Sequence, residues 1–178
     1  MHYTTLDTSD EQDVKQLFIR TFAESEGQSE GELIGGLVLE ILTATPADDF
    51  CGFVACKDDQ IIGCIIFSRL LFESKVNSFL LSPVAISPDY QRQGVGQGLI
   101  NFGLAALKRD GVELVFTYGD PGYYSKVGFR TIMEEVVKAP LTLSFSEGWL
   151  GQSLVGDGVD PIAGRSRCIE AFNKPEIW

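Results

Sequence analysis

One junction near the middle of the chain constrains the fold more than any other feature of the sequence. A predicted strand ending at Ile86 leads through Ser87–Tyr90 into the loop Gln91-Arg92-Gln93-Gly94-Val95-Gly96, and a predicted helix runs from Gly94 to Arg109. Glycine has no Cβ, so its backbone tolerates positive φ and close approach to a ligand. The first N–H groups of a helix lack intrahelical partners and favour an anion such as a pyrophosphate. The residues alone allow two interpretations: a tight strand-to-helix turn, or a pyrophosphate-binding loop.

Two other phosphate-binding loops do not match this segment. A Walker A loop needs Gly-Lys-Ser or Gly-Lys-Thr, and neither occurs in the chain. A dinucleotide fingerprint needs a third glycine three residues after Gly96, and that position is Leu99. The sequence therefore argues against a nucleotide-dependent function.

The charge of the chain restricts how an anion can bind. The formal net charge is −11, which argues against nucleic-acid binding, because nucleic-acid-binding proteins neutralise phosphates with Lys and Arg. An anionic ligand must therefore be attracted locally, by backbone N–H groups, a helix N-terminus and Arg92, the only cation in the loop.

Composition narrows the class of protein further. The four cysteines form no C-x-x-C pair and His2 is the single histidine, so we expect no metal site and no disulfide framework. No apolar stretch approaches the roughly 18 residues of a membrane span, and the first residues lack the features of a signal peptide. We therefore expect a cytoplasmic protein with no membrane partner.

Hydrophobic patterning predicts one α/β domain over residues 1–178. Capping boxes at Thr8–Glu11 and Ser29–Glu32 predict the starts of two helices, separated by the acidic connector Glu24–Gln28. The buried face of the second helix is predicted to hold Leu33, Leu37 and Ile41.

The remaining elements follow from alternation, apolar runs and turn residues. Strands are predicted at 50–56, 61–70, 77–86 and 114–118, a short helix at 121–126, weaker strands at 141–145 and 167–172, and a glycine-rich loop at 148–164. Pro83 lies inside the third of these strands and cannot donate to a ladder, so pairing is expected to be interrupted there.

Two motifs in fixed order resemble the GNAT superfamily of N-acetyltransferases, and a YhbS-like subgroup of predicted acetyltransferases in particular. Gln91–Gly96 matches the [QR]-x-x-G-x-[GA] signature of that family. Tyr123-Tyr124-Ser125-Lys126-Val127-Gly128-Phe129 is similar to its aromatic-Tyr-x-[KR]-x-Gly-Phe segment. The specific resemblance covers about residues 81–130.

This resemblance implies an α/β (α+β) GNAT fold, with a mixed, mostly antiparallel sheet of about six or seven strands flanked by helices. The sheet is expected to splay between its fourth and fifth strands, where the family holds the thioester of acetyl-CoA. Tyr124 would then face the thioester sulfur. The expected cofactor-binding residues are the end of the fourth strand and the glycine loop: Val84, Ala85, Ile86, Gln91, Arg92, Gln93, Gly94, Val95, Gly96 and Gln97.

The reaction implied is direct attack of a primary amine on acetyl-CoA, with the amine coming from a small molecule, peptide or protein. A phenol can donate to the leaving thiolate, and a backbone N–H at Val84 or Ala85 can stabilise the oxyanion. Acidic residues, either as bases or as a merely solvated surface, include Glu24, Glu26, Glu30, Glu32 and Asp120. A non-catalytic acyl-CoA sensor and a longer acyl donor stay open as alternatives. The family is often dimeric, so a homodimer is a further expectation.

Overall fold

The computed structural model describes residues 1–178. Its strands are β1 His2–Thr5, β2 Phe50–Lys57, β3 Gln60–Leu70, β4 Ser78–Ile86, β5 Leu114–Tyr118, β6 Arg130–Thr131 and β7 Trp149–Ser153. Its helices are α1 Glu11–Glu26, α2 Gln28–Ala44, α3 Val95–Arg109 and α4 Pro121–Tyr124. No helix combines the length and apolar character that a membrane crossing requires.

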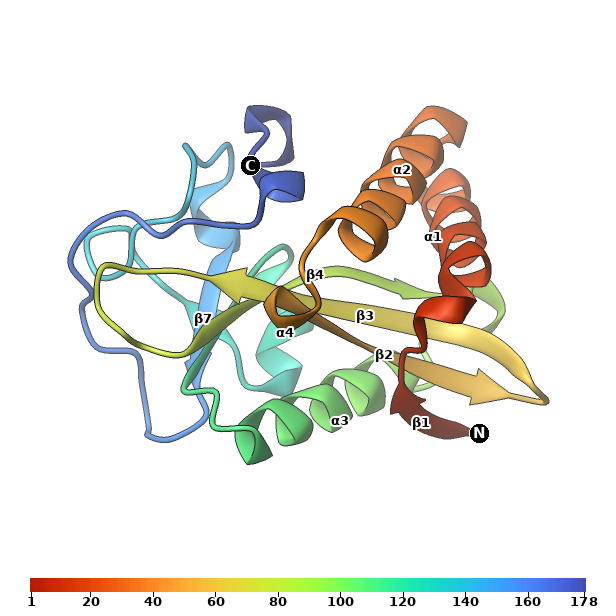
Figure 1. Cartoon of the computed structure of the whole chain (residues 1–178), viewed down its shortest axis with the longest axis horizontal. Helices are drawn as coiled ribbons and strands as arrows, with labels where there is room; N and C mark the ends of the chain where they lie inside the picture. Colours follow the sequence, from red (N-terminus) through yellow and green to blue (C-terminus); the bar gives the residue numbers. More distant parts are fainter. The chain divides into compact units, whose positions relative to one another are not determined.

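Hydrogen bonds join the seven strands in the order β1-β2-β3-β4-β5-β7-β6 (Figure 1). The β4–β5 pair is parallel, whereas β1–β2, β5–β7 and β6–β7 are antiparallel. The predicted mixed, mostly antiparallel sheet with flanking helices is therefore confirmed. β1 and β6 are short strands that the sequence analysis missed.

The chain forms two compact units. The first contains Met1–Ile66 and Pro83–Gly103, and the second contains Phe67–Ser82 and Leu104–Trp178. β3, β4 and α3 each contribute residues to both units.

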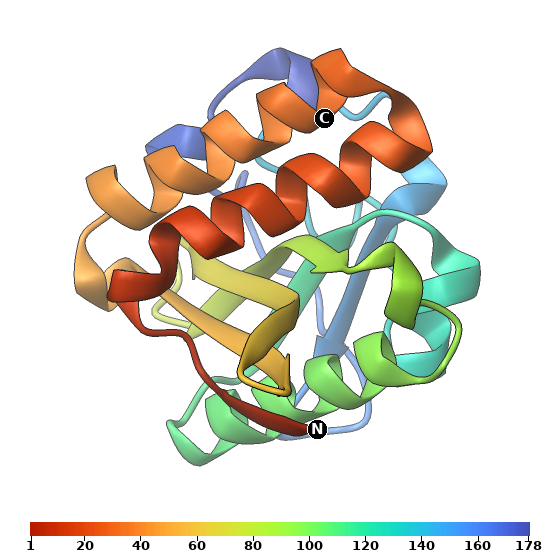
Figure 2. The same cartoon turned by 90° about the vertical axis from the view of Figure 1, so that its right-hand side faces the viewer.

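In the first unit, α1 and α2 lie side by side (Figures 1 and 2), joined by Gly27 with φ of 103°. The helices approach closely because Gly31 and Gly35 have no side chains. A Cβ added to Gly31 would lie only 2.6 Å from the Ile19 carbonyl oxygen, and one added to Gly35 would overlap the Ile19 side chain. Leu33 follows Gly31 by two residues, so it points to the opposite side of α2. It is 67% exposed, and its predicted place in the core is wrong.

Neither predicted capping box forms. The Asp7 carboxylate accepts a hydrogen bond from the Ser9 N–H at 2.8 Å and caps a 3-10 turn over Thr8–Asp10 that leads into α1. α2 begins at Gln28 without a side-chain cap. The predicted acidic connector is therefore helical except at Gly27, because α1 continues to Glu26.

α3 packs on the face of the first unit opposite α1 and α2 (Figure 2). Its Gly98 lies against the Tyr3 ring of β1, and the Phe53 and Phe102 rings meet edge to face with centroids 5.7 Å apart. A Cβ on Gly63 of β3 would lie 3.4 Å from Leu99. β3 therefore runs directly beneath the start of α3.

The second unit is built around stacked aromatic rings of β5 and β7. The Phe116 and Trp149 ring centroids lie 5.2 Å apart, and Gly151 of β7 leaves room for the Phe116 ring. β7 lies inside the predicted loop 148–164, which is therefore partly wrong. The predicted strands 141–145 and 167–172 are also wrong: the first is irregular, and the second holds one isolated bridge and a 3-10 turn.

Candidate functional site

The loop between β4 and α3 presents a run of unpaired backbone N–H groups. The Gln91 N–H donates to the Pro88 carbonyl at 3.3 Å, and the Gly98 N–H donates to the Gly94 carbonyl at 2.9 Å. Between these two bonds, the six N–H groups of residues 92–97 have no hydrogen-bond partner within the protein. Backbone N–H groups at a helix N-terminus attract anions. The loop can therefore bind a phosphate through its backbone.

Positive φ angles shape this loop. They occur at Arg92, with φ of 58°, and at Gly94, with φ of 80°. A Cβ on Gly94 would meet no atom within 4 Å, so the space beside this residue is open. Most of the predicted cofactor residues here are accessible: Gln91–Gly94 are exposed, Gly96 and Gln97 are half-buried, and the Val95 side chain packs in the core.

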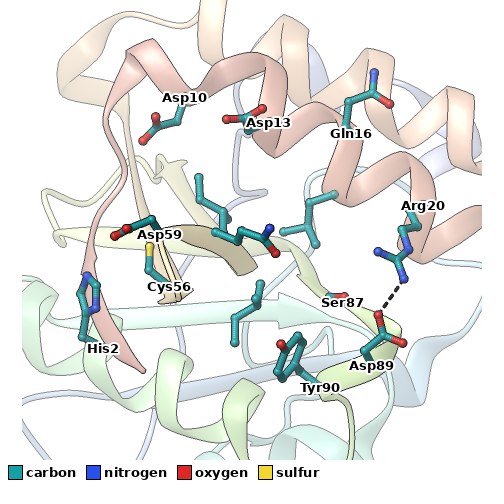
Figure 3. A pocket seen from close by; sticks show the side chains of 14 residues that line it. His2, Asp10, Asp13, Gln16, Arg20, Cys56, Asp59, Ser87, Asp89 and Tyr90 are labelled. Carbon is teal, nitrogen blue, oxygen red and sulfur yellow. Dashed lines mark hydrogen bonds and ion pairs between the residues drawn. The ribbon is translucent and has the colours of Figure 1, made fainter.

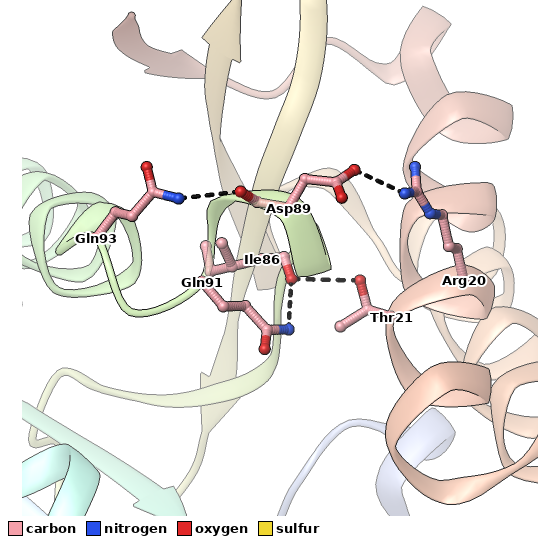
Figure 4. Close-up of polar contacts among 6 residues, drawn as sticks. All are labelled: Arg20, Thr21, Ile86, Asp89, Gln91 and Gln93. Carbon is pink, nitrogen blue, oxygen red and sulfur yellow. Dashed lines mark hydrogen bonds and ion pairs between the residues drawn. The ribbon is translucent and has the colours of Figure 1, made fainter.

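Side chains tie this loop to the end of β4 and to α1 (Figure 4). Gln91 Nε2 donates to the Ile86 carbonyl at 2.9 Å, and the Thr21 hydroxyl donates to the same oxygen at 3.5 Å. Asp89 accepts from Arg20 at 2.7 Å through its carboxylate and from Gln93 Nε2 at 3.0 Å through its carbonyl. The signature glutamine therefore fixes the backbone that carries the N–H groups.

β4 changes the direction in which its backbone polar groups face. In an extended strand, alternate residues bond to the same neighbouring strand. Just before β4, the Asn77 carbonyl accepts from the N–H groups of Glu113 and Leu114, at the start of β5. Just after β4, the Ser87 N–H donates instead to the Ile62 carbonyl of β3 at 2.8 Å. One extra residue, as in a β-bulge, accounts for this change. Pro83, where pairing was expected to be interrupted, lies in this stretch of β4.

Pairing between β4 and β5 ends at Leu81 and Thr117, although β4 continues to Ile86. Thr117 is 1% exposed, and its hydroxyl donates to the Leu81 carbonyl at 2.8 Å. Tyr124 of α4 lies close enough to Thr117 for the Thr117 hydroxyl to lower the pKa of its phenol. The predicted catalytic phenol therefore lies where β4 and β5 stop pairing.

The Tyr124 ring is held on several sides. Its centroid lies 5.8 Å from that of Phe129 and 5.1 Å from that of Tyr123, both edge to face. A Cβ on Gly119 would come within 2.8 Å of the ring. Gly128, with φ of 94°, ends the turn after α4 and brings Phe129 back to the ring. The Gly-Phe motif thus positions the phenol.

The environment keeps this phenol protonated. Burial raises the pKa of Tyr124 to about 12, the Thr117 hydroxyl opposes the rise, and Tyr123 and Asp120 add smaller increases. An ordinary phenol has a pKa of about 10. Tyr124 is therefore a hydrogen-bond donor throughout the neutral range.

The candidate acidic residues divide into two groups. The Asp120 carboxylate accepts from the Gly122 N–H at 2.8 Å and caps α4, so it has a structural role. The others lie around Gly27, where α1 meets α2. These junction glutamates are Glu24, Glu26, Glu30 and Glu32, of which Glu30 is half-buried and the rest exposed.

Sequence comparison agrees with this arrangement. A model of the acetyltransferase (GNAT) domain matches residues 48–131. An uncharacterized N-acetyltransferase of Escherichia coli K12, YjhQ, is 30% identical over 177 residues, which cover 95% of this chain and 93% of YjhQ. The chain belongs to the GNAT acetyltransferase family.

Solved GNAT structures share the fold. YhbS from Escherichia coli, a GNAT N-acetyltransferase determined with CoA, superposes with a TM-score of 0.80 at 24% identity, covering 97% of this chain and 92% of YhbS. A GNAT acetyltransferase from Brucella melitensis, determined with acetyl-CoA, gives a TM-score of 0.72 at 24% identity and 97% coverage of each chain. The GNAT fold therefore extends over nearly the whole chain.

Two polar residues of the site were missed by the sequence analysis. Thr117 is the one aliphatic hydroxyl in β5, between Phe116 and Tyr118, and that contrast was available as a signal. Thr21 lies on α1 and its bond to Ile86 spans 65 residues of sequence, so no local pattern indicates it.

Proposed function

We propose that this GNAT protein transfers an acetyl group from acetyl-CoA to a primary amine by direct attack. The observation that carries the proposal is the run of six unpaired N–H groups over residues 92–97. A pyrophosphate bound there would accept hydrogen bonds from these groups and would be stabilised by the dipole of α3. Such local attraction is what an anionic ligand needs in a protein of net charge −11.

The end of β4 supplies the backbone for the acyl group. The Ser87 N–H donates to β3. Because alternate residues of a strand face the same neighbour, the backbone polar groups of Ala85 also face β3, whereas those of Val84 and Ile86 face away from it. We therefore assign the oxyanion donor to the Val84 N–H, of the two candidates Val84 and Ala85. A preorganised donor of this kind is worth about 3–4 kcal/mol in other enzymes.

Tyr124 assists the leaving thiolate. With a pKa of about 12, its phenol is a weaker acid than an ordinary thiol of pKa about 8.5. Complete proton transfer to the thiolate is therefore uphill, and Tyr124 acts as a hydrogen-bond donor to sulfur as the C–S bond breaks. The C–N bond forms when the amine attacks the thioester carbonyl, and the C–S bond then breaks. The proton lost by the amine neutralises the thiolate. The products are an amide and a free thiol.

The acceptor is a primary amine of a small molecule, peptide or protein. The junction glutamates lie where α1 meets α2, and the last turn of α1 contains no basic residue that could neutralise them. Their negative charge would favour a cationic amine over a neutral one through local Coulomb attraction.

A glycine pair tests the binding part of the proposal. Gly94 and Gly111 have φ of 80° and 83°, and a Cβ at either meets no atom within 4 Å. Replacing each by Glu therefore imposes a similar left-handed strain, of about 1–2 kcal/mol. Only Gly94→Glu places bulk and negative charge beside the unpaired N–H groups.

The measurement is the melting temperature with and without acetyl-CoA. At a hundredfold excess over Kd, binding adds about 2.7 kcal/mol, or roughly 5–10 °C for a chain of this size. We expect the wild type and Gly111→Glu to show this shift and Gly94→Glu to lose it. Stabilisation by ATP or NADH in preference to acetyl-CoA would refute the proposal. A screen of amines that follows free thiol release then separates an enzyme from a non-catalytic CoA-binding module.

A further inference from the structure

The first unit contains a cavity of about 620 Å³ that the proposed acetyl transfer does not use. Its walls come from α1, from the turn between β2 and β3, and from the turn Ser87–Tyr90 (Figure 3). Cavities of about 300–1,000 Å³ are the size of small-molecule sites. The volume is therefore far larger than a single metal ion needs.

The walls are acidic. The labelled carboxylates of Asp10, Asp13, Asp59 and Asp89 line the cavity (Figure 3). Only Asp89 has an ion-pair partner, Arg20 at 2.7 Å. An anionic ligand is disfavoured here by charge repulsion, so this cavity does not suit the phosphates of CoA.

One serine of the cavity wall has a hydroxyl that no protein group engages. Ser87 is 6% exposed and lines the cavity wall. Its N–H bonds to Ile62 and its carbonyl accepts from Tyr90, but its hydroxyl makes no hydrogen bond and does not cap the following turn. The Ser87 hydroxyl is therefore available to a ligand.

Apolar and aromatic surface completes the lining. Leu17, Ile61 and Ile62 form part of the wall, and Leu17 and Ile62 are less than 9% exposed. Tyr90 also lines the cavity, and its ring already accepts a cation, because Lys57 Nζ lies 4.9 Å from the ring centroid. A ligand here meets carboxylates together with apolar surface.

The remaining groups that face the carboxylates are Cys56, Gln16, Gln60 and His2. Burial raises the pKa of the Cys56 thiol, and the negative charges of Asp10 and Asp59 raise it further. The Cys56 thiol is therefore neutral near pH 7 and adds no negative charge. No group of His, Cys, Asp and Glu side chains in the chain is arranged to hold a metal ion.

We propose that this cavity binds an organic diamine, with ammonium groups on the carboxylates and a methylene chain on the apolar wall. One ammonium group would bind between Asp10, Asp13 and Asp59, and the other would donate to the Ser87 hydroxyl near Asp89. Carboxylate–ammonium hydrogen bonds are about twice as strong as neutral ones. The site is separate from acetyl transfer, so its test does not depend on turnover.

The test is calorimetric titration of the protein with 1,5-diaminopentane in the absence of acetyl-CoA. The variant Asp10→Asn/Asp13→Asn/Asp59→Asn removes the unpaired carboxylates. A matched control removes three exposed aspartates of the second unit: Asp110→Asn/Asp157→Asn/Asp160→Asn. Both triple variants change the net charge equally, so the comparison isolates the cavity from general electrostatic attraction.

We expect the cavity variant to weaken diamine binding at least tenfold and the control variant to change it by less than threefold. Ser87→Ala should weaken binding about threefold or more, and pentylamine, with one ammonium group, should bind at least tenfold more weakly than the diamine. Equal weakening in both triple variants, equal binding of the monoamine, or unchanged binding in the cavity variant with an unaltered melting temperature would each overturn the proposal.

Discussion

Replacing Tyr124 by Phe removes one hydroxyl and leaves its surroundings in place. The ring contacts with Phe129 and Tyr123 do not involve the hydroxyl. Thr117 keeps its bond to the Leu81 carbonyl at 2.8 Å, so no buried donor loses its partner. The variant therefore loses at most one neutral hydrogen bond, worth about 0.5–1.5 kcal/mol. We expect the melting temperature to fall by no more than about 1–6 °C.

The effect on catalysis should be larger than the effect on stability. General acid assistance is typically worth about 10²–10⁴-fold, but a phenol of pKa about 12 stabilises the thiolate without full proton transfer. We therefore expect kcat to fall by about 10–100-fold, equivalent to about 1.4–2.7 kcal/mol. The Kd for acetyl-CoA should stay within about twofold, since the unpaired N–H groups are unchanged.

The assay is single-turnover thiol release, with Tyr123→Phe as the matched control. Tyr123 is the neighbouring half-buried phenol, and the proposal gives its hydroxyl no role, so its variant should react like the wild type. Because folding raises the pKa of Tyr124, protonation is complete below about pH 10 and is lost only as the pH rises toward about 12. No loss of rate below about pH 10 should therefore arise from this group. A Tyr124→Phe protein that reacts at the wild-type rate in single turnover would show that Tyr124 only packs.

Three further outcomes test other features. Gly35→Ala should destabilise the protein by about 1–3 kcal/mol, because the new methyl overlaps Ile19, whereas Gly36→Ala, which meets no atom within 4 Å, should stabilise it by up to about 1 kcal/mol in thermal unfolding. Gln91→Glu, which cannot donate to the Ile86 carbonyl, should raise the Kd for acetyl-CoA at least fivefold in titration. Gln91→Arg keeps a donor at this position and should therefore bind acetyl-CoA with a Kd close to that of the wild type. Replacing all four junction glutamates by Gln should raise the KM of cationic amines at least threefold and leave acetyl-CoA binding unchanged; equal kinetics would remove these residues from the acceptor site.

The elements that the sequence predicted best are those with an unbroken local signal. The apolar run of β3 and the short apolar strand β5 are buried on both faces, so composition and bounding turns identify them without tertiary information. The glycine loop was located for a related reason: it needs glycine where φ is positive, and Gly94 has φ of 80°. A backbone requirement of this kind can be predicted from the residue type alone.

The elements that the sequence misplaced depend on partners distant in the chain. β7 contains Gly151, which reads as a loop residue but is there because the Phe116 ring packs against it. Leu33 has helical spacing with Leu37, yet the close approach of α1 to Gly31 turns Leu33 outward. In the site, the loop and Tyr124 were predicted, but the Thr117 and Thr21 hydrogen bonds were not, because both reach across the fold.

The division of β3, β4 and α3 between the two units bears on how the chain folds. The polypeptide passes from one unit to the other at 66–67, 82–83 and 103–104, each time within a strand or helix. A cut at any one of these positions releases neither unit intact and breaks a hydrogen-bonded element. Neither unit is therefore a separable fragment, and denaturant unfolding should follow a single transition that circular dichroism and tryptophan fluorescence report alike. Because the first unit ends at Gly103, it cannot be completed during synthesis until that residue has emerged, and by then Phe67–Ser82 of the second unit has already been made.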